Sequence, residues 1–448
     1  MDFPGWSVDC GSKARAWIAF GPSHRYIEVL TEALTKTKPT ILLATTCRWL
    51  STARLAVALT NAGCSVEAVC PPGQPVRKTS VLQRAYTYHG LAPLASFADA
   101  ITTAKPDLII PSDDLATRHL HDLYYRAQKE GESGAQLRAL LERSLGAPSS
   151  FPVTYGRTAF MESAREEGIR VPKTAVIANL TDLRKWIDTM GLPAVLKANG
   201  TSGGEGVRVV HTVEEAERAF RRLQAPPMLA RVAKWVIVDQ DMTLVWPALL
   251  RRRSIVNAQT FVPGREATSL AACWKGTVVA SLHFEVLSKQ DSSGPATVMR
   301  MVDNPEMTAT AEKMARRLNL SGLHGFDFML EKETGNAYLI EINARATQVG
   351  HLALGPGRDL AAALYAAVTG NMVRPAPKLT EKDTIALFPQ EWLRNPQSPF
   401  LRSGYHDVPW EEPDLVRSCI RKSRKWTFWK RPHQKWMEVF SGDHLPRL

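Results

Sequence analysis

The chain has 448 residues, of which 44% are hydrophobic and 22% charged, the balance of an ordinary globular protein with roughly two to four domains. No segment approaches the ~20 consecutive apolar residues of a membrane-spanning helix, and the first residues show no secretory signal, so we expect neither a membrane span nor secretion. Six cysteines without CxxC spacing argue against a disulfide framework and a zinc site, and favour the cytoplasm. The net charge of +12 permits an anionic ligand without choosing between nucleotide, nucleic acid and a membrane surface.

The N-terminal third alternates short apolar runs with amphipathic stretches. Strands are expected at 39–45, 65–70 and 107–111, and helices at 50–62 and 114–128. Such alternation predicts a parallel sheet covered by helices. We therefore expect an N-terminal α/β domain over residues 1–148, with an irregular start.

The rest of the chain is expected to form two further units and an extension. Its strands are expected at 173–178, 192–198, 207–210, 257–263, 268–274, 277–286, 324–331 and 337–343. Its helices are expected at 156–168, 181–190 (capped by Thr181), 213–223 (capped by Thr212), 305–319 and 357–369. The units are a small lobe with an irregular insertion (149–256), a larger lobe (257–370) and a basic, aromatic extension (371–448).

The strongest chemical signal is a predicted hairpin of residues 325–331 and 337–345. With its turn centred on Thr334, Asp327 falls directly opposite Glu341, with Cβ atoms ~5 Å apart. Two carboxylates this close repel each other unless a cation binds them. Magnesium takes one or two carboxylates plus phosphate oxygens, so the pair predicts a magnesium site.

Side-chain alternation assigns the neighbouring residues to two faces. Glu341, Asn343 and Arg345 share the face of the carboxylates, whereas Ile340 and Ile342 point into a core. The alternative is that one of the acids pairs with Arg345 on a solvated face.

A glycine-rich loop follows the strand that ends near Lys197. Gly203, Gly204 and Gly206 would let main-chain N–H groups approach phosphate oxygens, and Lys197 would add a positive charge. The lysine precedes the glycines, so this is not a Walker A loop. Taken alone, the segment could equally be a hairpin connection.

These motifs together resemble the ATP-grasp superfamily, which includes carboxylate–amine ligases and biotin-carboxylase-like enzymes. The resemblance covers about residues 150–370 and rests on 195–206, 261–266, 325–330 and 341–345. It implies the fold class α/β and α+β, in which a parallel α/β pre-grasp domain precedes a two-lobed ATP-grasp fold with antiparallel sheets.

The resemblance also implies roles for individual residues. Asp327, Glu341 and Asn343 would bind magnesium, and Arg345 would orient an acyl phosphate or the γ-phosphate. Two positions depart from the family pattern: Arg157 stands where a lysine is frequent, and Gln259 where an acid often starts the adenine slot. The implied nucleotide contacts are Arg157, Lys197, Gly203, Gly204, Gly206, Gln259, Phe261, Val262 and Glu266.

The predicted function is an ATP- and magnesium-dependent ligase that activates a carboxylate as an acyl phosphate and joins it to an amine. Manganese could replace magnesium. The alternatives are a carboxyphosphate-type carboxylase and a nucleotide-binding regulator without turnover. The sequence does not name the acid, the amine or the oligomeric state, although the N-terminal sheet and the tail are candidate homodimer surfaces.

Other residues admit a functional and a structural interpretation. His351 could contact substrate but is more simply structural, Arg358 could meet a carboxylate or lie in solvent, and Asp113 could bind ligand or cap a helix. The basic, aromatic segment 417–436 could bind single-stranded nucleic acid, but packing of its aromatic residues on the parent domain is the favoured interpretation.

Overall fold

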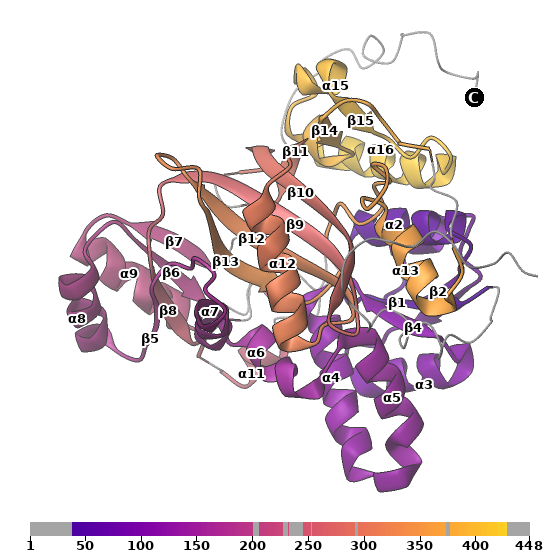
Figure 1. Cartoon of the computed structure of the whole chain (residues 1–448), viewed down its shortest axis with the longest axis horizontal. Helices are drawn as coiled ribbons and strands as arrows, with labels where there is room; N and C mark the ends of the chain where they lie inside the picture. Colours follow the sequence, from indigo (N-terminus) through magenta and orange to yellow (C-terminus); the bar gives the residue numbers. More distant parts are fainter. Residues whose placement is uncertain are drawn as a thin grey trace, which may run out of the picture.

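The computed structural model describes residues 38–199, 206–226, 232, 245–251, 253–291, 294–372 and 377–427. The predicted ligands Gly203 and Gly204, the first 37 residues and the segment after Thr427 lie outside this set. The described residues form three sheets with helices packed on them (Figure 1). Within the described part of the chain, every helix is too short or too polar to cross a membrane.

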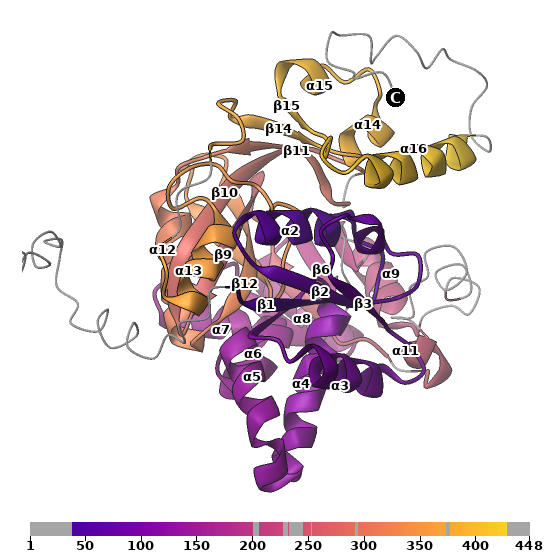
Figure 2. The ribbon, with the colours of Figure 1, turned by 90° about the vertical axis from the view of Figure 1, so that its right-hand side faces the viewer.

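The first sheet is parallel, as the sequence predicts, and has the strand order β3-β2-β1-β4. Figure 2 shows α2 on one face of this sheet and α3, α4 and α5 on the other. Asp113 caps α4 by accepting from the amide of Ala116 at 2.8 Å, which confirms its capping role. The elements are β1 (Thr40–Ala44), α2 (Leu50–Asn61), β2 (Ser65–Cys70), β3 (Arg84–Thr87), α3 (Pro93–Ala104), β4 (Leu108–Pro111), α4 (Asp114–Lys129) and α5 (Ala135–Leu145).

A second, antiparallel sheet has the order β5-β8-β6-β7 and is covered by α8 and α9. The strand expected at the start of the larger lobe is β8, and it pairs with β5 and β6 here. The small lobe therefore extends beyond residue 256, to the end of β8. The cap of α8 is Asn179 and not Thr181. The elements are β5 (Thr174–Ile177), α8 (Leu180–Met190), β6 (Ala194–Ala198), β7 (Val207–Val210), α9 (Val213–Gln224), α11 (Val245–Leu249) and β8 (Val256–Thr260).

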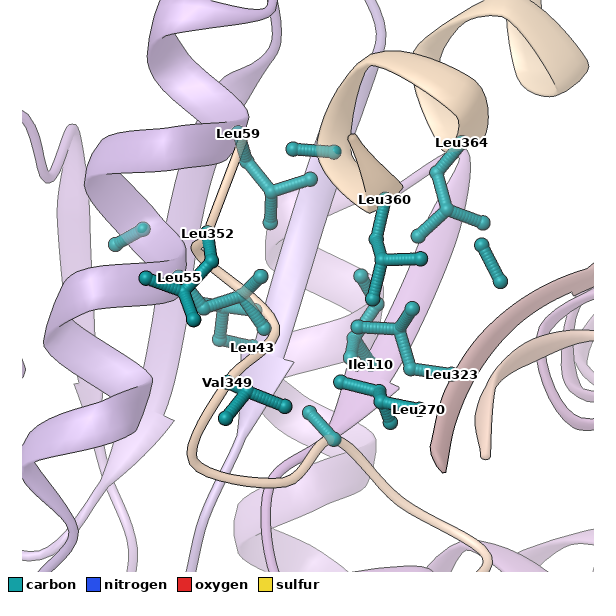
Figure 3. Packing of buried hydrophobic residues seen from close by; sticks show 14 of the residues in the cluster. Leu43, Leu55, Leu59, Ile110, Leu270, Leu323, Val349, Leu352, Leu360 and Leu364 are labelled. Atoms are coloured by element: carbon teal, nitrogen blue, oxygen red, sulfur yellow. The ribbon is translucent and has the colours of Figure 1, made fainter. Parts of the chain in front are cut away.

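The third sheet has seven strands in the order β13-β12-β9-β10-β11-β14-β15. One face packs on α12 and on α7, a helix that the sequence assigned to the small lobe. The other face packs on the N-terminal domain and α13 (Figure 3). The elements are α6 (Phe151–Tyr155), α7 (Arg157–Glu166), β9 (Gly264–Trp274), β10 (Thr277–Lys289), β11 (Ala296–Met301), α12 (Pro305–Leu318), β12 (Gly322–Glu331), β13 (Ala337–Asn343) and α13 (Leu360–Thr369).

Within the expected extension, residues 384–407 continue the third sheet through β14 and β15. A buried cluster attaches β15 to the N-terminal domain. Asp407 accepts from Arg54 Nη2 at 2.7 Å and lies 2.8 Å from His351 Nε2. His351 is thus a buried partner of Asp407, and Arg358 pairs with Asp303. The remaining elements are β14 (Thr384–Leu387), α14 (Gln390–Arg394), α15 (Phe400–Ser403), β15 (Tyr405–Asp407) and α16 (Pro413–Thr427).

Removing the Asp407 carboxylate should destabilise the fold strongly. Its side chain is 2% exposed, so Asp407→Ala leaves the buried Arg54 guanidinium without its counter-charge. We expect the free energy of unfolding to fall by about 3 kcal/mol, measured by urea denaturation. The matched control is Asp414→Ala, because the Asp414 side chain is 77% exposed in its pair with Arg417 and should contribute less than about 0.5 kcal/mol. Equal losses in both variants would contradict this assignment.

Candidate active site

At the end away from the turn, β12 and β13 pair in the predicted register. Asp327 pairs with Glu341, which confirms the predicted pair. Gly325 pairs with Asn343, which places Asn343 on the same face two residues further along β13. Gly335 closes the turn with a φ of 74°, a left-handed conformation that glycine adopts without strain.

Near the turn, the pairing register of the two strands differs from the predicted register by one residue. The register shifts directly after the Asp327–Glu341 pair, so that Phe328 pairs with Leu339. Ile340 is therefore the extra residue of a β-bulge, and it is half-buried instead of lying in the apolar core. The expectation that Ile340 points into the core is wrong, whereas Ile342 is buried there as expected.

Asp327 is held by hydrogen bonds to both of its carboxylate oxygens. Thr268 Oγ1 donates to Asp327 Oδ1 at 2.8 Å, and Asn343 Nδ2 donates to Oδ2 at 2.9 Å. Burial and the negative charge of Glu341 nevertheless raise the pKa of Asp327 above its ordinary value. The carboxylate is thus fixed in place by two neutral hydrogen-bond donors.

Glu341 is paired with a cation from another part of the fold. Arg157, the first residue of α7, has its Nη1 2.9 Å from Glu341 Oε2. Burial alone would raise the pKa of Glu341, but Arg157 and Lys197 lower it below its ordinary value. The alternative pairing of these acids with Arg345 is not the one observed, because Arg157 takes that place.

Lys197 connects the small sheet to the hairpin. It lies in β6, its side chain is 5% exposed, and its Nζ donates to the carbonyl of the bulged Ile340 at 3.4 Å. Burial lowers the pKa of Lys197 to about 8, with Arg157 adding to the shift and Glu341 opposing it. The amine therefore faces the same space as Glu341.

Arg345 follows the hairpin and turns toward the N-terminal domain. Its Nε donates to Asp114 Oδ1 at 2.9 Å, and its Nη2 donates to Asn343 Oδ1 at 3.1 Å. Thr268 and Asp114 are thus members of the site that sequence reasoning missed. Each contacts its partner across elements distant in the sequence, so no local pattern marks it.

The residues expected beside a nucleotide base lie where β8 leads into β9. Gln259 is buried and donates to Thr174 Oγ1 at 3.0 Å, whereas Phe261 is partly exposed and Val262 is buried. Glu266 accepts from Lys289 Nζ at 2.6 Å. Gly206 is buried, and its carbonyl accepts from the amide of Ala198 at 2.8 Å.

The donor atoms around Asp327 fit a magnesium ion. Among the described residues, no group of three or more His, Cys, Asp or Glu side chains is placed to hold a metal. Magnesium, however, needs few protein ligands, because it keeps waters and takes phosphate oxygens. Two opposed carboxylates and the Asn343 amide oxygen supply hard oxygen donors, and the two carboxylates repel each other.

Residues 158–349 match a family model whose description is ATP-grasp domain. The chain contains an ATP-grasp domain. The hairpin and Lys197 both lie inside this match, and the three sheets form the two-lobed fold with a preceding parallel α/β domain that the resemblance implies.

Curated relatives align with part of the chain at low identity. Phosphoribosylamine–glycine ligase of Fusobacterium nucleatum is 22% identical over 42% of this chain and 44% of its own length. Acetyl-CoA carboxylase 1 of Oryza sativa is 24% identical over 40% of this chain and 7% of its own length. The chain thus spans less than half the length of these relatives.

Solved ATP-grasp structures share the fold at larger coverage. The biotin carboxylase domain of a Hydrogenobacter thermophilus 2-oxoglutarate carboxylase, in complex with MgADP and bicarbonate, has a TM-score of 0.53 and 15% identity over 75% of this chain and 70% of its own. N5-carboxyaminoimidazole synthase of Aspergillus clavatus, with ADP and its aminoimidazole ribonucleotide, has a TM-score of 0.54 and 14% identity over 77% and 80%. At these identities, the likeness establishes the fold alone.

Proposed function

We propose that this protein is an ATP- and magnesium-dependent ligase that activates a carboxylate as an acyl phosphate and joins it to an amine. The observation that carries the proposal is the Asp327–Glu341 pair on one face of the hairpin, with Lys197 and Arg157 beside it. This arrangement would provide both a cation site and the positive charge that a triphosphate requires. The reaction is assigned to the cytoplasm, and the protein could act as a homodimer.

Asp327, Glu341 and Asn343 would hold the magnesium ion, and manganese could take its place. When bound, the ion would neutralise charge on the terminal phosphates of ATP. Arg157 would then exchange Glu341 for a phosphate oxygen, because its guanidinium already lies 2.9 Å from the carboxylate.

The remaining residues would arrange the two reactants. Lys197 would bind the phosphates together with the main chain of Gly203, Gly204 and Gly206. The base and ribose would contact Gln259, Phe261, Val262 and Glu266. Arg345 would orient the γ-phosphate. A substrate carboxylate oxygen then attacks the γ-phosphorus, ADP leaves, and the amine nitrogen displaces phosphate from the acyl carbon as the amine proton passes to solvent.

Two groups of relatives favour two classes of acid. Phosphoribosylamine–glycine ligase joins an amine to an amino acid, as its name states, whereas the biotin carboxylase domain was solved with bicarbonate. A carboxyphosphate-forming reaction is therefore the second candidate. Bicarbonate belongs among the acids to be tested.

The test is ADP release from ATP and magnesium across pools of carboxylates and amines, with Glu341→Gln as control. We expect release only with a particular acid and amine, and none from the variant. Release with bicarbonate as the acid would favour the carboxylase. Tight magnesium-dependent ATP binding without release from any pool would favour a regulator and contradict the ligase proposal.

The pKa of Lys197 gives a separate prediction for ATP affinity. In the free protein, Lys197 loses its proton as pH rises through about 8, whereas bound phosphate would hold it protonated. Affinity for MgATP should therefore fall about tenfold between pH 7 and pH 9, as measured by titration calorimetry. Lys197→Met should bind more weakly at pH 7 and show no such fall. A wild-type affinity that stays constant over this range would count against phosphate binding by Lys197.

A further inference from the structure

Three hydrogen bonds attach the segment that follows β13 to the N-terminal domain. We call them the interdomain clip. All three reach the point where β4 ends and α4 begins, which is the carboxyl edge of the parallel sheet. They run from Ala346 N to Pro111 O (2.9 Å), from Thr117 Oγ1 to Ala344 O (3.0 Å) and from Arg345 Nε to Asp114 Oδ1 (2.9 Å).

Only one bond of the clip reaches a guanidinium group. The Arg345 side chain is 12% exposed, and its other contacts are Asn343 Oδ1 at 3.1 Å and the Ala346 carbonyl at 3.4 Å. Asp114 is the carboxylate that accepts a hydrogen bond from Arg345, whereas Asp113 and Asp327 act on the guanidinium through their charge alone. Without that carboxylate, an amide and a main-chain oxygen alone would orient the guanidinium.

Asp114 has a structural explanation that must be weighed first. It is the first residue of α4, where an acid is favoured by the helix dipole. The capping position is already filled, however, because Asp113 accepts from Ala116 N at 2.8 Å and from Thr46 N at 2.6 Å. Asp114 instead directs its Oδ1 across the domain boundary, and its side chain stays 48% exposed.

We propose that Asp114 of the N-terminal domain is a positioning residue that sets the orientation of Arg345 for the γ-phosphate. The inference rests on the MgATP binding of the proposed function, because Arg345 can meet a γ-phosphate only where the triphosphate binds. It makes the N-terminal domain part of the catalytic geometry, since a guanidinium displaced by about 1 Å can lower a rate a hundredfold.

The experiment compares Asp114→Asn, Asp114→Glu and Thr117→Val in the full chain. Two quantities are measured: kcat for acid- and amine-dependent ADP release, and the ratio of the MgADP to the MgATP dissociation constant. We expect Asp114→Asn to lower kcat about tenfold and the ratio several-fold, because the γ-phosphate loses an oriented partner. Asp114→Glu keeps the carboxylate, so its kcat and its affinity ratio should both lie close to the wild-type values.

Thr117→Val is the matched control, because it removes another bond of the clip without touching the guanidinium. It should lower the thermal midpoint but leave kcat and the affinity ratio unchanged. Wild-type values in Asp114→Asn would overturn the inference, as would equal losses in Asp114→Asn and Thr117→Val. If the wild-type protein binds MgATP but releases no ADP, the proposed function fails, and the affinity ratio alone decides the inference about Asp114. If the wild-type protein binds no nucleotide, the proposed function and the inference both fail.

Discussion

Asp327→Asn should abolish turnover and, at the same time, stabilise the metal-free protein. Loss of a carboxylate ligand should lower the rate about a thousandfold, equivalent to ~4 kcal/mol of transition-state stabilisation. The pKa of Asp327 is raised by burial and by repulsion from Glu341, and the neutral amide removes both the buried charge and the repulsion. We expect the thermal midpoint without magnesium to rise by about 2 °C.

The asparagine can be accommodated without an unpaired polar atom. Asn343 Nδ2 can still donate to the remaining oxygen, and the Thr268 hydroxyl can rotate to accept from the new amide. Activity and stability should therefore move in opposite directions, which a general folding defect cannot produce.

Glu341→Gln is the contrasting variant. It should also lose turnover, but its thermal midpoint should fall, because the buried Arg157 loses its counter-charge. Turnover retained in either variant would contradict the metal assignment. A lower midpoint in Asp327→Asn would contradict the inferred repulsion between the carboxylates.

Mild acid should destabilise the protein steeply, because at least four histidines among the described residues are held neutral by burial. Burial lowers the pKa of His119, His283 and His324 to about 4 and that of His121 to about 3, from an ordinary value of 6.5. Between these values, the unfolded chain binds protons that the folded chain does not. Stability is therefore fully present above pH 6.5 and is lost as pH falls toward 4.

The expected slope follows from the number of protons taken up. Each contributes about 1.4 kcal/mol per pH unit, so four contribute roughly 5 kcal/mol per pH unit in the steepest range. Urea denaturation midpoints at a series of pH values would measure this. A midpoint that stays constant from pH 7 to pH 5 would contradict the prediction.

His121→Phe provides the control for the acid prediction. His121 stacks on Phe151 with ring centroids 3.7 Å apart, and its Nδ1 has no hydrogen-bond partner. Phenylalanine should keep the stacking but cannot bind a proton. We expect the variant to lose about one quarter of the acid sensitivity, and an unchanged slope would show that His121 is not a source of it.

The sequence predicts those parts of the site that depend on local alternation. Gly335 marks the turn, and the sequence places both acids on the paired strands, but the register next to the turn would by itself pair Asp327 with Ile340. The predicted Asp327–Glu341 pair is therefore formed only because of the bulge. The bulge at Ile340 could not be foreseen from residue type alone, since β13 is an edge strand that pairs with β12 and whose Leu339 amide donates to the distant Arg170 carbonyl.

The sequence patterns could not predict contacts between elements that are distant in the chain. The strand signal of β8 was correct, but its partners β5 and β6 lie far away in the chain, so its lobe was assigned wrongly. The same holds for β14 and β15, which join the large sheet. Thr268 and Asp114 enter the site through tertiary contacts of this kind.

The most direct test of the proposed ligase reaction traces a carboxylate oxygen of the acid into the released phosphate. The acid identified in the ADP-release assay is labelled with a heavy oxygen isotope in its carboxylate and supplied with ATP, magnesium and the amine. An acyl phosphate transfers one carboxylate oxygen to the phosphate that the amine displaces, so we expect each released phosphate to carry the label. Unlabelled phosphate, or release of AMP and pyrophosphate in place of ADP, would contradict acyl phosphate formation at this site.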